Sequence, residues 1–242
     1  MPTPAPTSTT RRAQLAKGLG AALLGLGVLT GCSSEDDLSD QDVEEVLAQA
    51  SDTLLETSGL QLRLATDDLP DGVTGITSAE GVATDAPAFE GDLRVRLAGN
   101  DFTVPVVAVD GTVWAQIPLT PGWSDVDPAE YGAPDPALLI SPDQGFATLL
   151  QEVQDPEAVE QERGGVDNAE VLTRYAGTVD GAVMENVIPS SAGDSFDVEF
   201  LVTEDGELRR AELSGVFYAD SDEMTYTVDL TDYGTTQQIT AP

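Results

Sequence analysis

The sequence predicts an α+β fold, in which one curved, mostly antiparallel sheet of about ten strands carries three or four helices. Many segments alternate apolar and polar residues with a period of two, as strands do when one face contacts a core and the other faces water. Between two such segments, Asp110-Gly111 is a strong signal for a two-residue β-hairpin. No repeat or linker divides the chain after its first forty residues, so we expect one domain over residues 41–242.

Residues 1–31 are predicted to be a secretory signal. Arg11, Arg12 and Lys17 precede an uncharged apolar stretch, residues 18–30, which is shorter than the ~20 residues of a membrane-spanning helix. The stretch ends in Leu29-Thr30-Gly31-Cys32, which resembles a bacterial lipobox, where the cysteine thiol receives a diacylglyceryl group. We therefore expect a lipid anchor on Cys32, an acidic tether over residues 32–40, and a mature protein on the extracytoplasmic face of the cell membrane. An ordinary signal peptide with an incidental cysteine is the alternative.

Composition excludes several classes of function. The chain has 44 Asp and Glu against 10 Lys and Arg, and a net charge of −34 argues against nucleic acid as a partner. With no His and a single Cys, neither a disulfide nor a His-based catalytic triad can form. Carboxylate pairs such as Asp125 and Asp127 are expected by chance among so many acids, and no nucleophile accompanies them. We expect no catalysis, metal or cofactor.

A helix is expected at the start of the folded domain, with Ser39 as its N-cap. Apolar residues then recur at helical spacing from Val43 to Leu54, and Gly59 is expected to close the helix. One face of this helix is apolar, so it needs a sheet to cover.

Two sets of strands are expected to supply that sheet. Residues 89–97 show the pattern well, because Phe89, Leu93, Val95 and Leu97 fall on one face and charged residues on the other. The expected strands are 60–64, 89–97, 102–106 and 112–117 in the first set, and 171–175, 196–202, 208–216 and 224–230 in the second. Between the sets we expect a proline-rich loop over 118–142 and a helix over 143–153, with another short helix over 180–187.

A curved sheet of this size with one apolar face raises the question of what fills its interior. A closed barrel of ~8 strands is just filled by its own side chains or holds one small ligand, and more strands leave space inside. A dry void would be unfavourable, so remaining space would suit an apolar guest. A conventional sheet-and-helix core without a cavity is equally compatible with the pattern.

Five segments in order resemble the actinobacterial LppX/LprAFG lipoproteins, in particular their LprG-type members. They are Leu29–Cys32 followed by a helix, Val106–Gly111, Gly122–Asp125, Pro142–Ala147 and Val153–Pro156. The resemblance implies a half-open antiparallel barrel, similar in shape to LolA and LolB, with helices over its concave face and an apolar cavity for acyl chains. It also implies transport of triacylated glycolipids or other acylated envelope lipids, beside a major-facilitator export pump.

The resemblance also implies which residues line the cavity. Leu93 is the leading candidate, and the others are Val95, Leu97, Phe102, Val104, Val106, Phe146, Leu149 and Leu150. Each of these could equally be an ordinary core residue, and Trp123 is expected to close a hairpin onto the sheet. The predicted mature chain has no lysine, so an anionic head group would need Arg63, Arg94, Arg96 or a bound cation. The sequence thus predicts a membrane-anchored carrier of acylated lipids, with a non-catalytic scaffold of an envelope transporter as the alternative.

Overall fold

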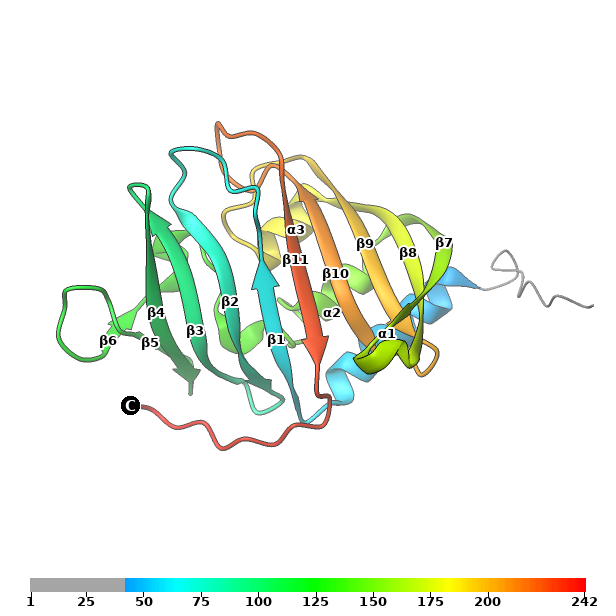
Figure 1. Cartoon of the computed structure of the whole chain (residues 1–242), viewed down its shortest axis with the longest axis horizontal. Coiled ribbons are helices and arrows are strands. Elements are labelled where there is room, and N and C mark those ends of the chain that lie inside the picture. Colours follow the sequence, from blue (N-terminus) through cyan, green and yellow to red (C-terminus); the bar gives the residue numbers. More distant parts are fainter. Residues whose placement is uncertain (1–41) are drawn as a thin grey trace, which may run out of the picture. The chain divides into compact units, whose positions relative to one another are not determined.

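The computed structural model describes residues 42–242, in which eleven strands form one antiparallel sheet (Figure 1). The order of the strands is β6-β5-β4-β3-β2-β1-β11-β10-β9-β8-β7, so β6 and β7 are the two edges and the sheet is not closed. Strands that follow one another in the sequence are neighbours, except that β6 and β7 lie at opposite edges, and the pairing of β1 with β11 joins the two sets. The predicted α+β half-barrel is confirmed, with one strand more than the ten or so expected.

The strands have the following bounds: β1 (Gly59–Ala65), β2 (Gly75–Thr84), β3 (Ala88–Leu97), β4 (Asn100–Val109), β5 (Thr112–Ala115), β6 (Ser124–Val126), β7 (Gln154–Gly164), β8 (Glu170–Asp180), β9 (Ser195–Thr203), β10 (Leu208–Gly215) and β11 (Met224–Thr231). Three of them, β2, β6 and β7, were not expected from the sequence. The alternation signal is weak there because β2 consists largely of small residues, β6 has three residues, and β7 is an exposed edge strand rich in acids.

The first helix, α1 (Val43–Glu56), begins later than expected and ends earlier. Its N-cap is Asp42, whose Oδ1 accepts a hydrogen bond from the Glu45 amide at 3.3 Å, whereas Ser39 lies outside the described residues. The predicted role of Gly59 was wrong, because the helix ends at Glu56 and Gly59 opens β1. A Cβ at Gly59 would lie 2.7 Å from the Thr235 carbonyl oxygen, so glycine is required for close backbone packing.

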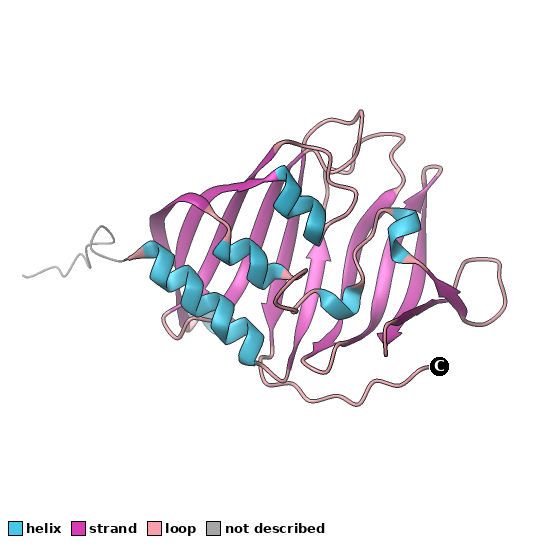
Figure 2. Ribbon diagram, turned by 180° about the vertical axis from the view of Figure 1, so that it is seen from behind, coloured by secondary structure: helices cyan, strands magenta, loops and turns pink. Residues whose placement is uncertain are grey.

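Helices lie on one face of the sheet and cover its two halves unequally (Figure 2). Over β7–β11 lie the three α-helices, α1, α2 (Phe146–Gln151) and α3 (Gly181–Val187). Over β2–β4 there are short 3₁₀ turns, η2 (Pro128–Tyr131) and η3 (Pro136–Leu138); a third, η4 (Val166–Asn168), joins β7 to β8. The half under the α-helices is therefore the more thickly covered.

The thickly covered half has a closely packed core. The ring of Phe217 lies 4.9 Å from that of Phe196 and 5.0 Å from that of Tyr226, at angles typical of aromatic pairs. Ser51 ties α1 to α2, because its hydroxyl donates to the Ala147 carbonyl at 3.2 Å and accepts from the Gln151 amide at 2.7 Å. These contacts hold α1 and α2 together and order the aromatic core beneath the helices.

The other face of the sheet is polar and carries ion pairs between neighbouring strands. Arg174 on β8 contacts Glu162 at 2.8 Å and Glu160 at 3.5 Å, both on β7, and also Glu199 on β9. The hydrogen bonds to Glu162 and Glu199 raise the pKa of Arg174 above its already high ordinary value. Within residues 42–242, no helix is both long and apolar enough to cross a membrane.

Candidate functional site

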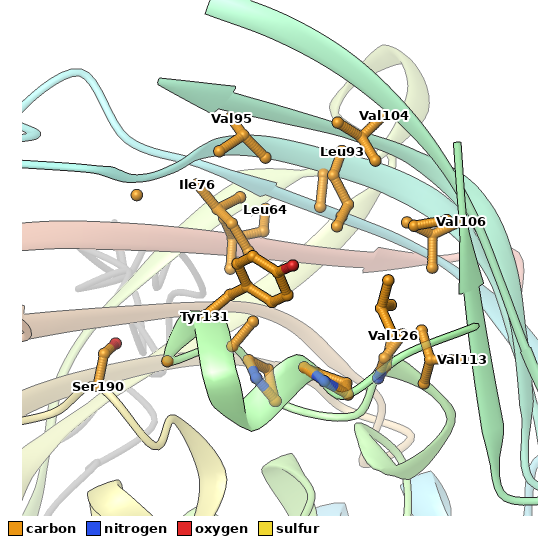
Figure 3. A pocket seen from close by; sticks show the side chains of 18 of the residues that line it. Leu64, Ile76, Leu93, Val95, Val104, Val106, Val113, Val126, Tyr131 and Ser190 are labelled. Carbon is orange, nitrogen blue, oxygen red and sulfur yellow. The ribbon is translucent and has the colours of Figure 1, made fainter. Parts of the chain in front are cut away.

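An apolar cavity of about 500 Å³ lies between the thinly covered half of the sheet and the segment that carries η2 and η3 (Figure 3). Seven strands supply its sheet wall: Leu62 and Leu64 from β1, Gly75, Ile76 and Ala79 from β2, Phe89, Leu93, Val95 and Leu97 from β3, Phe102, Val104 and Val106 from β4, Val113 and Ala115 from β5, Val126 from β6, and Tyr226 from β11. In Figure 3, Leu93, Val104 and Val106 point from the sheet into this space, and Tyr131 faces them from η2. The cavity thus occupies the part of the sheet that the α-helices leave uncovered.

Small residues on the sheet make room for the cavity. Gly81 and Gly91 are partners across β2 and β3, and the Phe89 ring lies against both. A Cβ would lie 2.5 Å from Phe89 Cζ at Gly81 and 2.8 Å from it at Gly91, so either side chain would displace the ring. The two glycines therefore let Phe89 lie close to the sheet, where it contributes to the wall without filling the space in front of it.

The exposure of the wall residues identifies the closed end and the mouth. Phe89 and Phe146 are each 1% exposed and lie at the closed end, whereas Leu97 is 52% exposed and Tyr131 is 68% exposed. Leu97 and Phe89 are the ends of one row on β3, eight residues apart, which spans ~26 Å at about 3.3 Å per residue. The cavity therefore runs along the strands from a mouth near Leu97 and Tyr131.

Seven of the nine candidate lining residues meet at this cavity. On the paired strands β3 and β4, Leu93 is opposite Val104 and Val95 is opposite Phe102, and all four line it. Leu97, Val106 and Phe146 line it as well. The other two, Leu149 and Leu150, follow Phe146 on α2 but are buried in the core and are not among the lining residues. Binding of a ligand by any of them stays a prediction.

The arginines considered as partners for a head group lie outside the cavity. Arg63, Arg94 and Arg96 do not line the cavity, because they alternate with residues that do and so lie on the opposite face of the sheet. Arg96 instead pairs with Asp101 at 2.9 Å. Trp123, expected to close a hairpin onto the sheet, is 36% exposed at the end of the β5–β6 loop. Cys32 lies outside the described residues.

The wall from β2 and the cover that closes the cavity were not predicted from the sequence. Ile76 and Ala79 gave no signal because β2 lacks a run of large apolar residues. The cover comes from the stretch between β6 and α2, where Pro128 and Pro136 each open a 3₁₀ turn after an aspartate N-cap. Aspartate followed by proline was the available signal, and it is typical of a helix start as well as a turn.

The cavity contains few polar groups, and two of them, the hydroxyls of Tyr218 and Tyr226, form a hydrogen bond with each other. The Tyr226 hydroxyl donates to the Ile76 carbonyl at 2.9 Å, so the Tyr218 hydroxyl donates to Tyr226, also at 2.9 Å. Burial is the main cause of the raised pKa of Tyr226, whose phenol is therefore neutral. Among the described residues that line the cavity, Glu130 at the mouth alone carries a charge. An anionic group inside would meet no cationic side chain in this wall.

The size of the cavity indicates what can occupy it. Without a guest, these apolar walls would lack packing partners across a space of about 500 Å³, which is unfavourable. Water gains little from walls with so few polar partners. The arrangement suits an apolar guest, and no cluster of ligands that could hold a metal is present among residues 42–242.

The sequence matches a known family over nearly all of the described residues. The family model of the LppX_LprAFG lipoproteins covers residues 42–241. The chain belongs to the LppX_LprAFG lipoprotein family. It is 27% identical over 235 residues to the lipoarabinomannan carrier protein LprG of Mycolicibacterium hassiacum, which covers 93% of this chain and 96% of that protein.

Two solved structures of the LppX_LprAFG family have the same fold. LprF from Mycobacterium bovis superposes with a TM-score of 0.67 at 18% identity, over 83% of this chain and 96% of that one. LppX from Mycobacterium tuberculosis superposes with a TM-score of 0.59 at 15% identity, over 83% of this chain and 100% of that one. The unclosed sheet described above is therefore the fold of the family.

Proposed function

We propose that this protein is a membrane-anchored lipid carrier, which holds the acyl chains of a lipid or glycolipid in its cavity and moves them across the cell envelope. The observation that carries the proposal is the cavity itself, whose sheet wall is aliphatic and aromatic along its whole length. Membership of a family that includes a protein named as a lipoarabinomannan carrier supports the same class of cargo.

The driving force for loading is the hydrophobic effect. Burial of each methylene group stabilises the bound state by about 0.8 kcal/mol relative to water. Acyl chains in a membrane are already shielded from water. A carrier therefore needs only to match the affinity of the membrane for these chains. Walls of Leu, Val and Phe side chains impose few directional requirements, which suits acyl chains of several kinds.

The head group is expected to stay at the mouth. Glu130 and Tyr131 lie there, and the cavity wall offers no cation for a phosphate or carboxylate. An acylated lipid with an uncharged, hydroxyl-rich head group fits this chemistry, and a triacylated glycolipid is one member of that class. Attachment through Cys32 would keep the carrier on the extracytoplasmic face of the membrane, beside a major-facilitator pump that delivers or accepts the lipid.

Lipid transfer between two vesicle populations tests this function. The mature chain from residue 33 contains all eleven strands and the complete core, so it is the unit to use. Donor vesicles would carry a fluorescent triacylated lipid, and acceptor vesicles none. A rate of transfer that rises with protein concentration is the expected result. A rate that does not change with protein concentration would contradict the carrier and favour a scaffold without cargo.

A further inference from the structure

Exposed apolar side chains gather around the mouth of the cavity. Among the side chains that the structure describes, five large hydrophobic ones are exposed, and four of them, Leu97, Leu119, Trp123 and Tyr131, belong to elements that border the mouth. Leu97 and Tyr131 line the cavity, and Leu119 follows Pro118, which does so too. We call these four residues the rim patch. The fifth, Val159, is on β7 at the other edge of the sheet.

The β5–β6 loop gives the rim patch its most exposed member. The loop projects beyond the edge of the sheet beside β6 in Figure 1. Leu119 is 103% exposed and has a φ of 69°, a left-handed conformation that is unfavourable for a branched side chain. Residues 111–124 carry no charge and form the longest uncharged run within residues 42–242. In water, this leucine gains nothing from packing that would offset either its exposure or its backbone strain.

We propose that the rim patch is a membrane-docking surface, which inserts into a lipid bilayer so that acyl chains enter the cavity without crossing water. The proposal rests on the proposed carrier function for its purpose. Interfacial binding grows with the apolar area buried, and Trp and Tyr rings are typical of the boundary between head groups and acyl chains. A bilayer fits better than a folded partner because two of the four residues, Leu97 and Tyr131, also line the cavity that would receive the acyl chains.

Charges near the mouth decide which bilayer fits. Asp125, Asp127 and Glu130 follow the β5–β6 loop in the sequence and leave this side of the mouth negative. Near Leu97, Arg96 and Asp101 pair with each other at 2.9 Å, so this pair adds no net charge. A negative rim is repelled by anionic lipids within a Debye length of about 8 Å at physiological salt. Docking is therefore expected to be stronger on phosphatidylcholine vesicles than on vesicles that also contain phosphatidylglycerol.

Two tryptophans make the docking directly measurable. Trp123 belongs to the rim patch, whereas Trp114 lies between the lining residues Val113 and Ala115 and faces the opposite side of the sheet. The mature chain from residue 33 is mixed with phosphatidylcholine vesicles brominated in their acyl chains. In the Trp114→Phe variant, the emission of the remaining Trp123 should shift to shorter wavelengths and be quenched by the bromines. In the Trp123→Phe variant, the emission of the remaining Trp114 should neither shift nor be quenched. Equal quenching of both, or of neither, would overturn the proposal.

Substitution at the tip of the loop gives a second test. Leu119→Asn removes the apolar side chain and places a residue that tolerates the left-handed conformation, so folding is not at risk. We expect its partition onto phosphatidylcholine vesicles to fall about tenfold. Val159→Asn is the matched control and should bind as the unsubstituted chain does. An equal loss of vesicle binding in both variants would contradict membrane docking. So would a dimer in solution that forms through Leu119 and buries the rim patch.

Failure of docking can be told apart from failure of the carrier. The apolar dye N-phenylnaphthylamine, added without vesicles, reports on the cavity alone. Leu119→Asn should keep normal dye uptake while it loses vesicle binding, and Leu93→Trp should lose dye uptake while it keeps vesicle binding. Dye uptake without vesicle binding in the unsubstituted chain would overturn the docking surface and leave the carrier standing.

Discussion

Leu93→Trp is the substitution that probes the cavity most sharply. Leu93 lies midway along the cavity wall of β3, between Ala79 on β2 and Val104 on β4, and its side chain points into open space. The substitution adds about six heavy atoms, and each methylene of the guest that they displace forfeits about 0.8 kcal/mol. Loss of three to six methylenes weakens binding by about 2.4–4.8 kcal/mol, roughly 50- to 3000-fold in Kd.

The matched control is Arg94→Trp, which places the same ring on the opposite face of the same strand. Titration with N-phenylnaphthylamine gives Kd for both variants, and thermal unfolding followed by circular dichroism reports on the fold. Since the indole ring introduced by Leu93→Trp enters free volume and that of Arg94→Trp faces away from the cavity, we expect Tm to stay within ~4 °C of the unsubstituted protein in each case. A folded Leu93→Trp protein that binds as tightly as Arg94→Trp would refute the assignment of the cavity as the binding site.

Three further predictions concern stability. Saturation with an acyl ligand at about 100 times its Kd should stabilise the fold by about 2.7 kcal/mol, or ~5–11 °C in Tm by calorimetry, and an unchanged Tm would count against binding to the folded state. Gly91→Ala brings a Cβ to 2.7 Å from Gly81 Cα and 2.8 Å from Phe89 Cζ, so it should destabilise by about 1–3 kcal/mol in urea unfolding; Gly193→Ala, whose Cβ would lie 3.3 Å from Phe196 Cζ, should destabilise less. Burial raises the pKa of Tyr226 above its ordinary value of 10.0, so its contribution to stability is present below about pH 10 and is lost as pH rises further. Tyr226→Phe should therefore reduce the alkaline loss of stability, and an unchanged pH dependence would contradict this.

The sequence predicted the parts of the cavity that follow from regular alternation. Large apolar residues occupy every second position from Leu93 to Leu97 on β3 and from Phe102 to Val106 on β4, and the tight hairpin between these strands sets the register that brings Leu93 beside Val104. Period-two alternation shows which side chains share a face, and the family resemblance implied that this face lines a cavity.

Alternation could not show how the cavity is covered. Helical spacing identified Phe146, Leu149 and Leu150 as one buried face, but burial alone does not distinguish contact with a cavity from contact with a packed core. In the structure Phe146 reaches the cavity while Leu149 and Leu150 pack among core residues. The cover over β2–β4 depends on short proline-containing turns, and these are tertiary features that local patterns do not specify.

β2 explains why the cavity could not be settled from sequence alone. Its cavity face carries Ala79 and Gly81, residues that form no recognisable apolar stripe. Their small size is what allows the Phe89 ring to lie against the sheet and leaves space in front of it. The free volume of the cavity therefore depends on small residues such as Ala79 and Gly81. An apolar pattern in a sequence is recognised only from large side chains.

The lipid content of the purified protein is the most direct test of the carrier function. Residues 33–242 would be produced in an actinobacterial host, purified without detergent, extracted with organic solvent and analysed by mass spectrometry. We predict about one acylated lipid per protein molecule, sharply reduced in Leu93→Trp and unchanged in Arg94→Trp. A protein that contains no lipid and takes up none of an added triacylated lipid would contradict the account.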